Sequence, residues 1–289
     1  MSFIKNFFMI KFPCDKNIYV RGFCMIKWII SDMDGTLLVD HNKLPDDFDE
    51  MMALLKEKNI IFSPASGRQY QSLLGHFAKY KDDMIFIAEN GAFVCQNEKE
   101  LFSSVLPQKA VEFIVKEAEN FKHIPIALSG KKYAYIINTD PEFLYQLELY
   151  YTHYKVVKSF DEVDDEIVKI SICDCHMQNA RENVYKKLLP LCKDMQVILS
   201  SQIWVDIIPF NTNKGLAIEK VQERLGIRPE ECVAFGDYLN DYEMMQSVYY
   251  SYAMGNAVED LKKVARFEAP PNYENGVMNT ICKLLAENK

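Results

Sequence analysis

Short apolar runs and amphipathic segments of helical period alternate along the first part of the chain, at about 25–105. The apolar runs have the length of buried strands, and the stripe Phe48, Met51 and Leu55 is typical of one helix face. The expected elements are, in order, a strand at 26–31, a helix at 46–58, a strand at 59–63, a helix at 68–79 and a strand at 84–88. Because helices separate the strands, we expect a parallel sheet with right-handed crossovers.

The middle of the chain, about 106–208, follows a different pattern, in which a helix precedes a hairpin and this unit occurs twice. The hairpin turns are expected at Ser129-Gly130 and near Ser200-Ser201. The expected elements are a helix at 108–121, strands at 123–128 and 133–138, a helix at 141–153, a strand at 167–173, a helix at 177–192 and strands at 196–199 and 203–208. The repetition indicates a pseudo-duplicated domain built on an antiparallel sheet.

From about 209 the alternation of strands and helices returns. We therefore expect an α/β fold with a Rossmann-like, three-layer core around a parallel sheet, formed by 25–105 and 209–289. The segment 106–208 would be an inserted α/β cap domain, an antiparallel sheet plus helices. A second domain inserted into a ligand-binding core suggests a mobile cap that closes over substrate and excludes water.

Residues 1–24 do not fit either pattern. Their apolar residues are interrupted by lysines and are too few for a membrane-spanning helix, and a small-residue cleavage site is missing. Because Met25 directly precedes the first strand, we expect 1–24 to be a disordered extension outside the fold, as a misassigned start codon would give. Mass spectrometry of the natively expressed protein tests this explanation, and an N-terminus at Met1 would contradict it.

Composition and charge exclude some classes of partner. The 289 residues carry a net charge of −8, whereas nucleic acid binding calls for a basic surface. A small anionic substrate remains compatible, since a local cation matters more than net charge. The eight cysteines are irregularly spaced in a chain long enough to form its own core, so reduced thiols in the cytoplasm are the simplest explanation.

Two clusters of polar residues in the middle segment are expected to be structural. Cys173-Asp-Cys175-His176 has no second Cys or His pair at zinc-site spacing, and it ends the alternating strand pattern 168–173. We therefore expect strand packing there in preference to a metal site. The acidic run 161–166 is expected to be a solvated loop.

The first candidate for catalytic chemistry is a pair of carboxylates, Asp32 and Asp34, at the end of the first apolar run. A spacing of two directs both side chains to one face of a strand, and Gly35 lets the chain turn away. Two like charges held this close are costly unless a cation or a proton lies between them, and Mg²⁺ prefers such oxygen ligands. A calcium loop is excluded because Leu37 and Leu38 stand where further oxygen ligands would be needed.

Three later stretches place polar groups after strands or at a helix start. Ser66-Gly67-Arg68 follows the second strand and offers a hydroxyl and amides to an anion, although an ordinary turn would look the same. Lys214 begins a helical pattern that ends at Gly226, and it could be a surface lysine or a phosphate ligand. After Cys232–Gly236 come Asp237, Asn240 and Asp241, the last two of which could be helix caps. In open α/β sheets, ligands bind at these carboxyl ends of strands.

In this order, the four motifs resemble the haloacid dehalogenase superfamily of phosphotransferases, over nearly all of the chain from Met25. The run 87–92 and the long insert before Lys214 resemble the Cof-type branch, which carries a large C2B-type α/β cap. Many relatives have Thr where this chain has Ser66, but the hydroxyl is kept.

The residue types and the resemblance together imply a role for each position. The nucleophile would be Asp32, the general acid and base Asp34, and Lys214 would stabilise the charge on the nucleophile and phosphate. The phosphate-binding groups would be the backbone amides of Met33 and Gly67 with Ser66, Lys214 and Asn240. The Mg²⁺ site would comprise Asp32, the backbone carbonyl of Asp34, Asp237 and, as a support outside the coordination sphere, Asp241.

We therefore expect a Mg²⁺-dependent phosphatase that hydrolyses small phosphorylated metabolites through an aspartyl-phosphate. The resemblance implies sugar phosphates or phosphorylated cofactors such as pyridoxal phosphate or flavin mononucleotide. A phosphomutase and a non-catalytic phosphate-binding regulatory protein are the alternatives. The expected partner is the metabolite, without nucleic acid or membrane, for a cytoplasmic monomer or weak homo-oligomer. Lys131 and Lys132, at the first hairpin turn, could contact an anionic substrate or simply be solvated.

Overall fold

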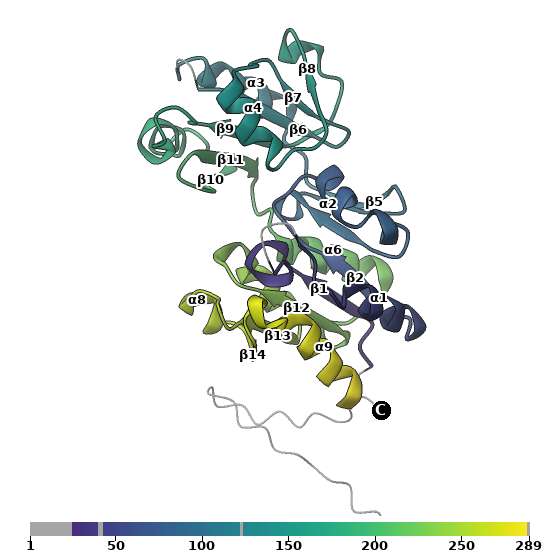
Figure 1. Ribbon diagram of the computed structural model, residues 1–289. Coiled ribbons are helices and arrows are strands. Elements are labelled where there is room, and N and C mark those ends of the chain that lie inside the picture. The colour runs from purple at the N-terminus through teal and green to yellow at the C-terminus, as the bar shows by residue number, and fades with distance from the viewer. Residues whose placement is uncertain (1–24, 40–42, 122–123, 288–289) are drawn as a thin grey trace, which may run out of the picture.

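The computed structural model describes residues 25–39, 43–121 and 124–287 (Figure 1). The predicted extension 1–24 lies outside the described residues. A five-stranded sheet has the order β14-β13-β12-β1-β2, and every pairing in it is parallel. Its strands are β1 (Trp28–Ser31), β2 (Ile61–Pro64), β12 (Cys232–Gly236), β13 (Tyr250–Met254) and β14 (Phe267–Ala269). This confirms the predicted parallel sheet.

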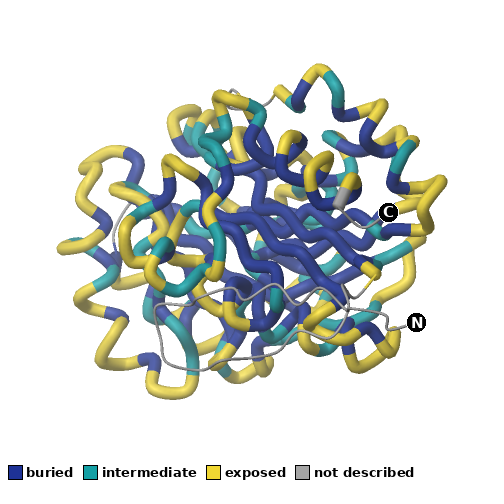
Figure 2. The backbone as a smooth tube through the Cα atoms, turned by 90° about the horizontal axis from the view of Figure 1, so that it is seen from below, coloured by how far each residue is buried: buried dark blue, intermediate teal, exposed yellow. Residues whose placement is uncertain are grey.

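Helices connect these strands and bury apolar stripes against them. They are α1 (Phe48–Glu57), α2 (Tyr70–His76), α6 (Lys214–Leu225), α7 (Tyr242–Ser247), α8 (Glu259–Lys262) and α9 (Gly276–Glu287). Strands β1, β12 and β13 are buried throughout, and Trp28, Phe62 and Phe235 belong to one apolar core. Figure 2 shows the strands as a buried layer with exposed segments on both sides of it. Strands of a parallel sheet that is covered on both faces are apolar throughout, as the sequence runs are.

A short antiparallel sheet extends the core beside β2. It contains β3 (Phe86–Ala88), β4 (Phe93–Gln96) and β5 (Lys99–Ser103). Two isolated parallel bridges, Phe62 to Met84 and Ala65 to Ile87, place the β3 segment next to β2. The predicted strand at 84–88 is therefore present, whereas the hairpin β4–β5 was not predicted.

The segment between α2 and α6 also forms a separate six-stranded sheet of order β10-β11-β9-β6-β7-β8. All its pairings are antiparallel except that of β7 with β8. The strands are β6 (Ile126–Gly130), β7 (Ala134–Ile136), β8 (Tyr154–Val156), β9 (Ile167–Cys173), β10 (Met195–Leu199) and β11 (Trp204–Pro209). Figure 1 shows this sheet as a second body above the parallel sheet, which confirms the predicted fold class of a core with a cap.

Helices cover both faces of the six-stranded sheet. They are α3 (Gln108–Ala118), α4 (Pro141–Glu148) and two consecutive helical stretches, Arg181–Tyr185 and α5 (Lys186–Leu188). One apolar cluster joins α3 and α5 to one face, and a second cluster joins α4 to the other. The two predicted helix-hairpin units are thus present, α3 before β6–β7 and α5 before β10–β11.

Three details of the prediction for this segment were wrong. Ser129 and Gly130 belong to β6, so the turn lies at Lys131–Lys132. The helix expected at 141–153 ends at Glu148, because the chain turns there to add β8. The helix expected at 177–192 is helical only from Arg181 to Leu188. In the described part of the chain, none of the helices is both long and apolar enough to cross a membrane.

Candidate active site

The predicted motifs meet at one edge of the parallel sheet. Asp32 follows β1, Ser66 follows β2 and Asp237 follows β12, and these three strands are neighbours. Parallel strands all present their carboxyl ends at the same edge, which brings these side chains together. A cavity of about 340 Å³ opens there. The predicted site residues among those lining it are Asp32, Asp34, Ser66, Gly67, Asp237 and Asn240.

Lys214 is the centre of the site's charge network. It is the first residue of α6. Asn213 caps the N-terminal end of this helix, because its Oδ1 accepts a hydrogen bond from the Leu216 amide at 2.8 Å. Its fully buried ammonium lies 2.5 Å from Asp32 Oδ1 and 2.6 Å from Asp241 Oδ1. Burial alone would lower the pKa of Lys214, but the two carboxylates more than offset this and raise it. The lysine is therefore charged, and it fixes the side chain of Asp32.

Asp237 and Asp241 complete a group of carboxylates at this edge. Asp241 Oδ2 accepts a hydrogen bond from the backbone amide of Asp237 at 3.0 Å. The Thr36 hydroxyl donates to Asp237 Oδ1 at 2.9 Å. Burial, and then the neighbouring charge of Asp241, raise the pKa of Asp237 to about 6. Burial also raises the pKa of Asp32, while Lys214 opposes this.

These acidic residues fit a divalent cation. Carboxylate oxygens of Asp32, Asp237 and Asp241 lie within 4.8 Å of one another. Three carboxylates against the single ammonium of Lys214 leave two negative charges, the charge that one divalent cation would neutralise. Burial is the main cause of the raised pKa of Asp237, and the negative charge of Asp241 adds to it. An all-oxygen set of this kind is what Mg²⁺ binds.

Asp34 is held by Arg68, a residue for which the sequence pattern indicates no role. Arg68 donates to both oxygens of Asp34, from Nη2 at 2.5 Å and from Nε at 2.9 Å. Arg68 is nearly buried, whereas the Asp34 side chain is about half exposed at the cavity. A bidentate guanidinium pair fixes the direction of a carboxylate. The signal for Arg68 was its position directly after Ser66-Gly67.

Small polar groups gather around the ends of β2 and β3. Ser66 Oγ accepts from the Arg68 amide at 3.2 Å, and its side chain is buried. A Cβ at Gly67 would lie only 3.0 Å from Asn90 Nδ2, so glycine permits this close approach. Asn240 Nδ2 donates to Asn90 Oδ1 at 3.2 Å. Of the predicted phosphate-binding residues, Ser66, Gly67 and Asn240 thus line the same cavity as Asp32, whereas Lys214 is fully buried behind it.

The six-stranded sheet supplies the opposite wall of the cavity. Its lining residues are Tyr150, Tyr151, Lys169, Ser171, Ser200, Ser201, Trp204 and Asp206. A chain of hydroxyls ends at Asp206. The hydroxyl oxygens of Tyr151 and Ser171 lie 2.8 Å apart. The Ser171 hydroxyl donates to Asp206 Oδ1 and the Ser200 hydroxyl donates to Asp206 Oδ2, both at 2.5 Å. This wall combines aromatic rings with ordered hydroxyls and one carboxylate.

Lys169 connects the two walls. It lies in β9, yet its ammonium forms an ion pair with Glu89 and donates to the carbonyl of Gly67 at 3.2 Å. Both charged side chains are almost fully buried. Burial raises the pKa of Glu89, and Lys169 opposes this. The sequence signal was a lysine inside a run of apolar strand residues.

The two lysines of the hairpin turn do not line the cavity. Lys131 forms ion pairs with Glu100 and Glu166, at 2.8 and 2.7 Å. The side chain of Lys132 donates to the carbonyl of Asp164 at 3.3 Å. The cation that this sheet brings to the cavity is Lys169.

Comparisons with known proteins agree with the geometry. Residues 29–281 match the family of haloacid dehalogenase-like hydrolases. The chain belongs to this family. It is 29% identical over 264 residues to the 5-amino-6-(5-phospho-D-ribitylamino)uracil phosphatase YbjI of Escherichia coli, which covers 90% of this chain and 96% of that protein.

Two further similarities extend over most of the hydrolase. The HMP-PP phosphatase of Klebsiella pneumoniae is 27% identical over 240 residues, which are 82% of this chain and 87% of that protein. A crystal structure from Eubacterium rectale has a TM-score of 0.82 at 25% identity and covers 90% of this chain and 100% of that one. The predicted superfamily and the class of hydrolase, a phosphatase, are thus confirmed.

Proposed function

We propose that this hydrolase is a Mg²⁺-dependent phosphatase that acts on small phosphorylated metabolites through an aspartyl-phosphate. The observation that carries the proposal is Asp32, held by the buried Lys214 at the floor of the cavity with Asp237 and Asp241 beside it. The two phosphatase relatives act, by their names, on small phosphorylated compounds. We propose the same class of substrate for this chain.

The reaction would run in two displacements. One oxygen of Asp32 attacks the phosphorus of the monoester, the bond from phosphorus to the leaving alkoxide breaks, and Asp34 gives its proton to that alkoxide. Asp34 then takes a proton from water, whose oxygen attacks the phosphoryl group and releases Asp32. Arg68, which donates to both oxygens of the Asp34 carboxylate, would orient it for the second step, in which it takes the proton from water.

Other residues would stabilise charge and orient the phosphoryl group. Ser66 with the amides of Met33 and Gly67, together with Asn240, would bind phosphate oxygens, and Lys214 would offset the charge between Asp32 and phosphate. The carboxylates of Asp32 and Asp237 and the backbone carbonyl of Asp34 would hold Mg²⁺, with Asp241 as their support. When bound, Mg²⁺ neutralises the repulsion between carboxylate and phosphate.

The cap wall indicates the kind of leaving group. Asp206, aligned by Ser171 and Ser200, is a hydrogen-bond acceptor for hydroxyl groups, and Trp204 and Tyr150 offer aromatic faces. We therefore propose a hydroxyl-bearing leaving group with a ring or short polyol, such as a sugar. The cap boundaries at 106 and 208 and the cytoplasmic location remain predictions.

The test is phosphate release from a panel of phosphorylated metabolites, with Mg²⁺ and with a chelator, by wild type and Asp32→Asn. The proposal predicts Mg²⁺-dependent release by wild type alone, because an amide cannot form the acyl-phosphate. Multiple turnover by Asp32→Asn would refute the nucleophile. Formation of an isomer without free phosphate would identify a phosphomutase, and binding without either product would identify a regulatory protein.

A further inference from the structure

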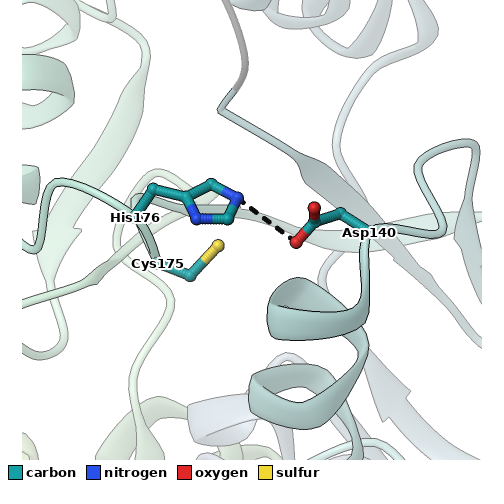
Figure 3. Close-up of side chains that lie close together, drawn as sticks. All are labelled: Asp140, Cys175 and His176. Carbon is teal, nitrogen blue, oxygen red and sulfur yellow. Dashed lines mark ion pairs between the residues drawn. The ribbon is translucent and has the colours of Figure 1, made fainter.

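Three side chains of different chemistry converge near one end of the six-stranded cap sheet, after its interior strand β9 and before α4. Asp140 precedes α4, and Cys175 and His176 follow β9 (Figure 3). One ligand atom from each lies within 4.8 Å of the other two, and His176 Nε2 is 3.2 Å from Asp140 Oδ1. We propose that these three residues bind one thiophilic divalent cation of the Zn²⁺ class.

The donor set distinguishes this site from the active site. A thiolate, an imidazole and a carboxylate are the ligands that Zn²⁺ takes, and three protein ligands leave a fourth position for water. The active-site cluster offers carboxylates only, which suit Mg²⁺. The chain would therefore carry two cation sites of different preference. The His176 side chain is about half exposed, so a cation can enter from solvent.

The surroundings favour positive charge. Asp140 Oδ1 already accepts from the amides of Glu142 and Phe143, both at 3.1 Å, while Oδ2 has no hydrogen-bond partner within the described ranges. Glu142 adds a second acidic side chain, in the first turn of α4. In the same described ranges, neither acid forms an ion pair with a lysine or arginine. A cation would supply the missing charge, and the Cys175 thiol would release its proton to solvent on binding.

The sequence alone argued against this site, because Cys173-Asp-Cys175-His176 lacks a second ligand pair. The fold supplies the third ligand from another element, α4. Cys173 itself is buried within β9 and pairs with Trp204 across the sheet, as strand packing predicts. Only a tertiary contact could add Asp140.

A bound ion would tie the loop after β9 to the start of α4. That helix packs Phe143 and Leu147 into the apolar cluster that contains Tyr151 and Trp204. Tyr151 and Trp204 also line the substrate cavity. The ion would therefore stabilise the cap wall without touching the substrate.

The test titrates Co²⁺, as a coloured substitute for Zn²⁺, into the full chain in the presence of excess Mg²⁺. Because Mg²⁺ does not bind thiolates, it occupies carboxylate sites and leaves this one open. We expect one equivalent of Co²⁺ to give a thiolate-to-cobalt charge-transfer band that Zn²⁺ then abolishes. Absence of a thiolate band in the reduced wild-type protein would overturn the proposal.

Variants assign the band to these residues. Cys175→Ser should remove it, and His176→Ala, a half-exposed position, should weaken Co²⁺ binding at least about tenfold. Cys192→Ser, another buried cap cysteine, is the matched control and should keep the wild-type band and affinity. A band that persists in Cys175→Ser, or wild-type affinity in His176→Ala, would contradict the assignment. Circular dichroism of each variant confirms that it is folded.

Discussion

At the scale of single residues, the site depends on one ammonium that holds two carboxylates. Lys214 is fully buried, and both of its partners, Asp32 and Asp241, are nearly so. Removing one member of a buried charge network leaves the others uncompensated in a medium that solvates them poorly. Stability and catalysis should therefore depend on the same side chain.

Lys214→Met should destabilise the metal-free protein by about 3–5 kcal/mol at neutral pH. The same change should lower phosphatase turnover by at least about 10²-fold, because it removes the charge that stabilises the phosphoryl group. Urea unfolding and phosphate release measure the two effects. Lys220→Met, an exposed position on the same helix, is the control and should change both by little. If Lys214→Met and Lys220→Met were equally stable, this would contradict a stabilising role for the ion pairs of Lys214 with Asp32 and Asp241.

Asp237 predicts a pH dependence with a definite sign. Its pKa of about 6 lies above the ordinary value of 3.8, so the folded state holds this proton more tightly than the unfolded chain does. Stability is then lost as pH rises from 3.8 through 6. Asp237→Asn should stabilise the metal-free protein by about 1–3 kcal/mol above pH 7 and by nothing below about pH 4.

Urea unfolding in chelator at both pH values measures this difference. With Mg²⁺ above pH 7, wild type should instead be more stable than Asp237→Asn. The cation stabilises the folded wild type, whereas the variant offers it one carboxylate ligand fewer. If Asp237→Asn were less stable than wild type in chelator above pH 7, this would contradict the raised pKa of Asp237 in the folded protein.

The predicted site residues could be found in the sequence because each stands next to a strand end or helix start. Asp32, Ser66 and Asp237 are of this kind, and local pattern alone places them at one sheet edge. Arg68 and Lys169 could not be assigned roles in the same way. Their partners, Asp34 and Glu89, become neighbours only when α2 and β9 take their places in the fold.

At the scale of elements, the turn after β1 brings the backbone at Gly35 against the carboxylate of Asp237. Gly35 has φ of +80°, which favours glycine, and a Cβ there would collide with the Asp237 carboxylate. Gly35→Ala should cost about 1–3 kcal/mol of stability and about 10²-fold in turnover, since it displaces groups at the reacting centre. Thermal unfolding and phosphate release measure both.

Gly75→Ala is the matched control for this change. Gly75 lies inside α2, and a Cβ there would meet nothing within 4 Å. Because Gly75 is the last residue but one of α2, alanine there should stabilise by at most about 0.5–1 kcal/mol, the effect in a helix interior, and should leave turnover unchanged. The two substitutions are therefore expected to have opposite signs, and a neutral Gly35→Ala would contradict the role of the turn.

Elements with strong periodicity were predictable, and short ones were not. The helix at Lys214–Leu225 ends at Gly226 in a left-handed conformation, as its sequence indicates. In contrast, β8 has three residues and exposed side chains, and it is a strand only because β7 pairs with it. The same applies to the hairpin β4–β5, whose second strand is largely polar.

At the scale of the whole molecule, Lys169 and Glu89 form a buried ion pair between the cap sheet and the core. Lys169→Met should destabilise the protein by about 3–5 kcal/mol, because Glu89 would remain buried and unpaired. The double variant Lys169→Met/Glu89→Gln should recover most of this loss. Additive effects in a double-mutant cycle by urea unfolding would contradict the pairing.

The central claim is that Asp32 becomes phosphorylated during turnover, and trapping that species tests it most directly. Asp34→Asn would be mixed with Mg²⁺ and 4-nitrophenyl phosphate, whose leaving group needs no proton, and then quenched in acid. Intact and peptide mass spectrometry should find one phosphoryl group, on the peptide that contains Asp32, and none in Asp32→Asn/Asp34→Asn. A phosphoryl group on another residue, or release of nitrophenol by Asp34→Asn without any modified protein, would contradict the account.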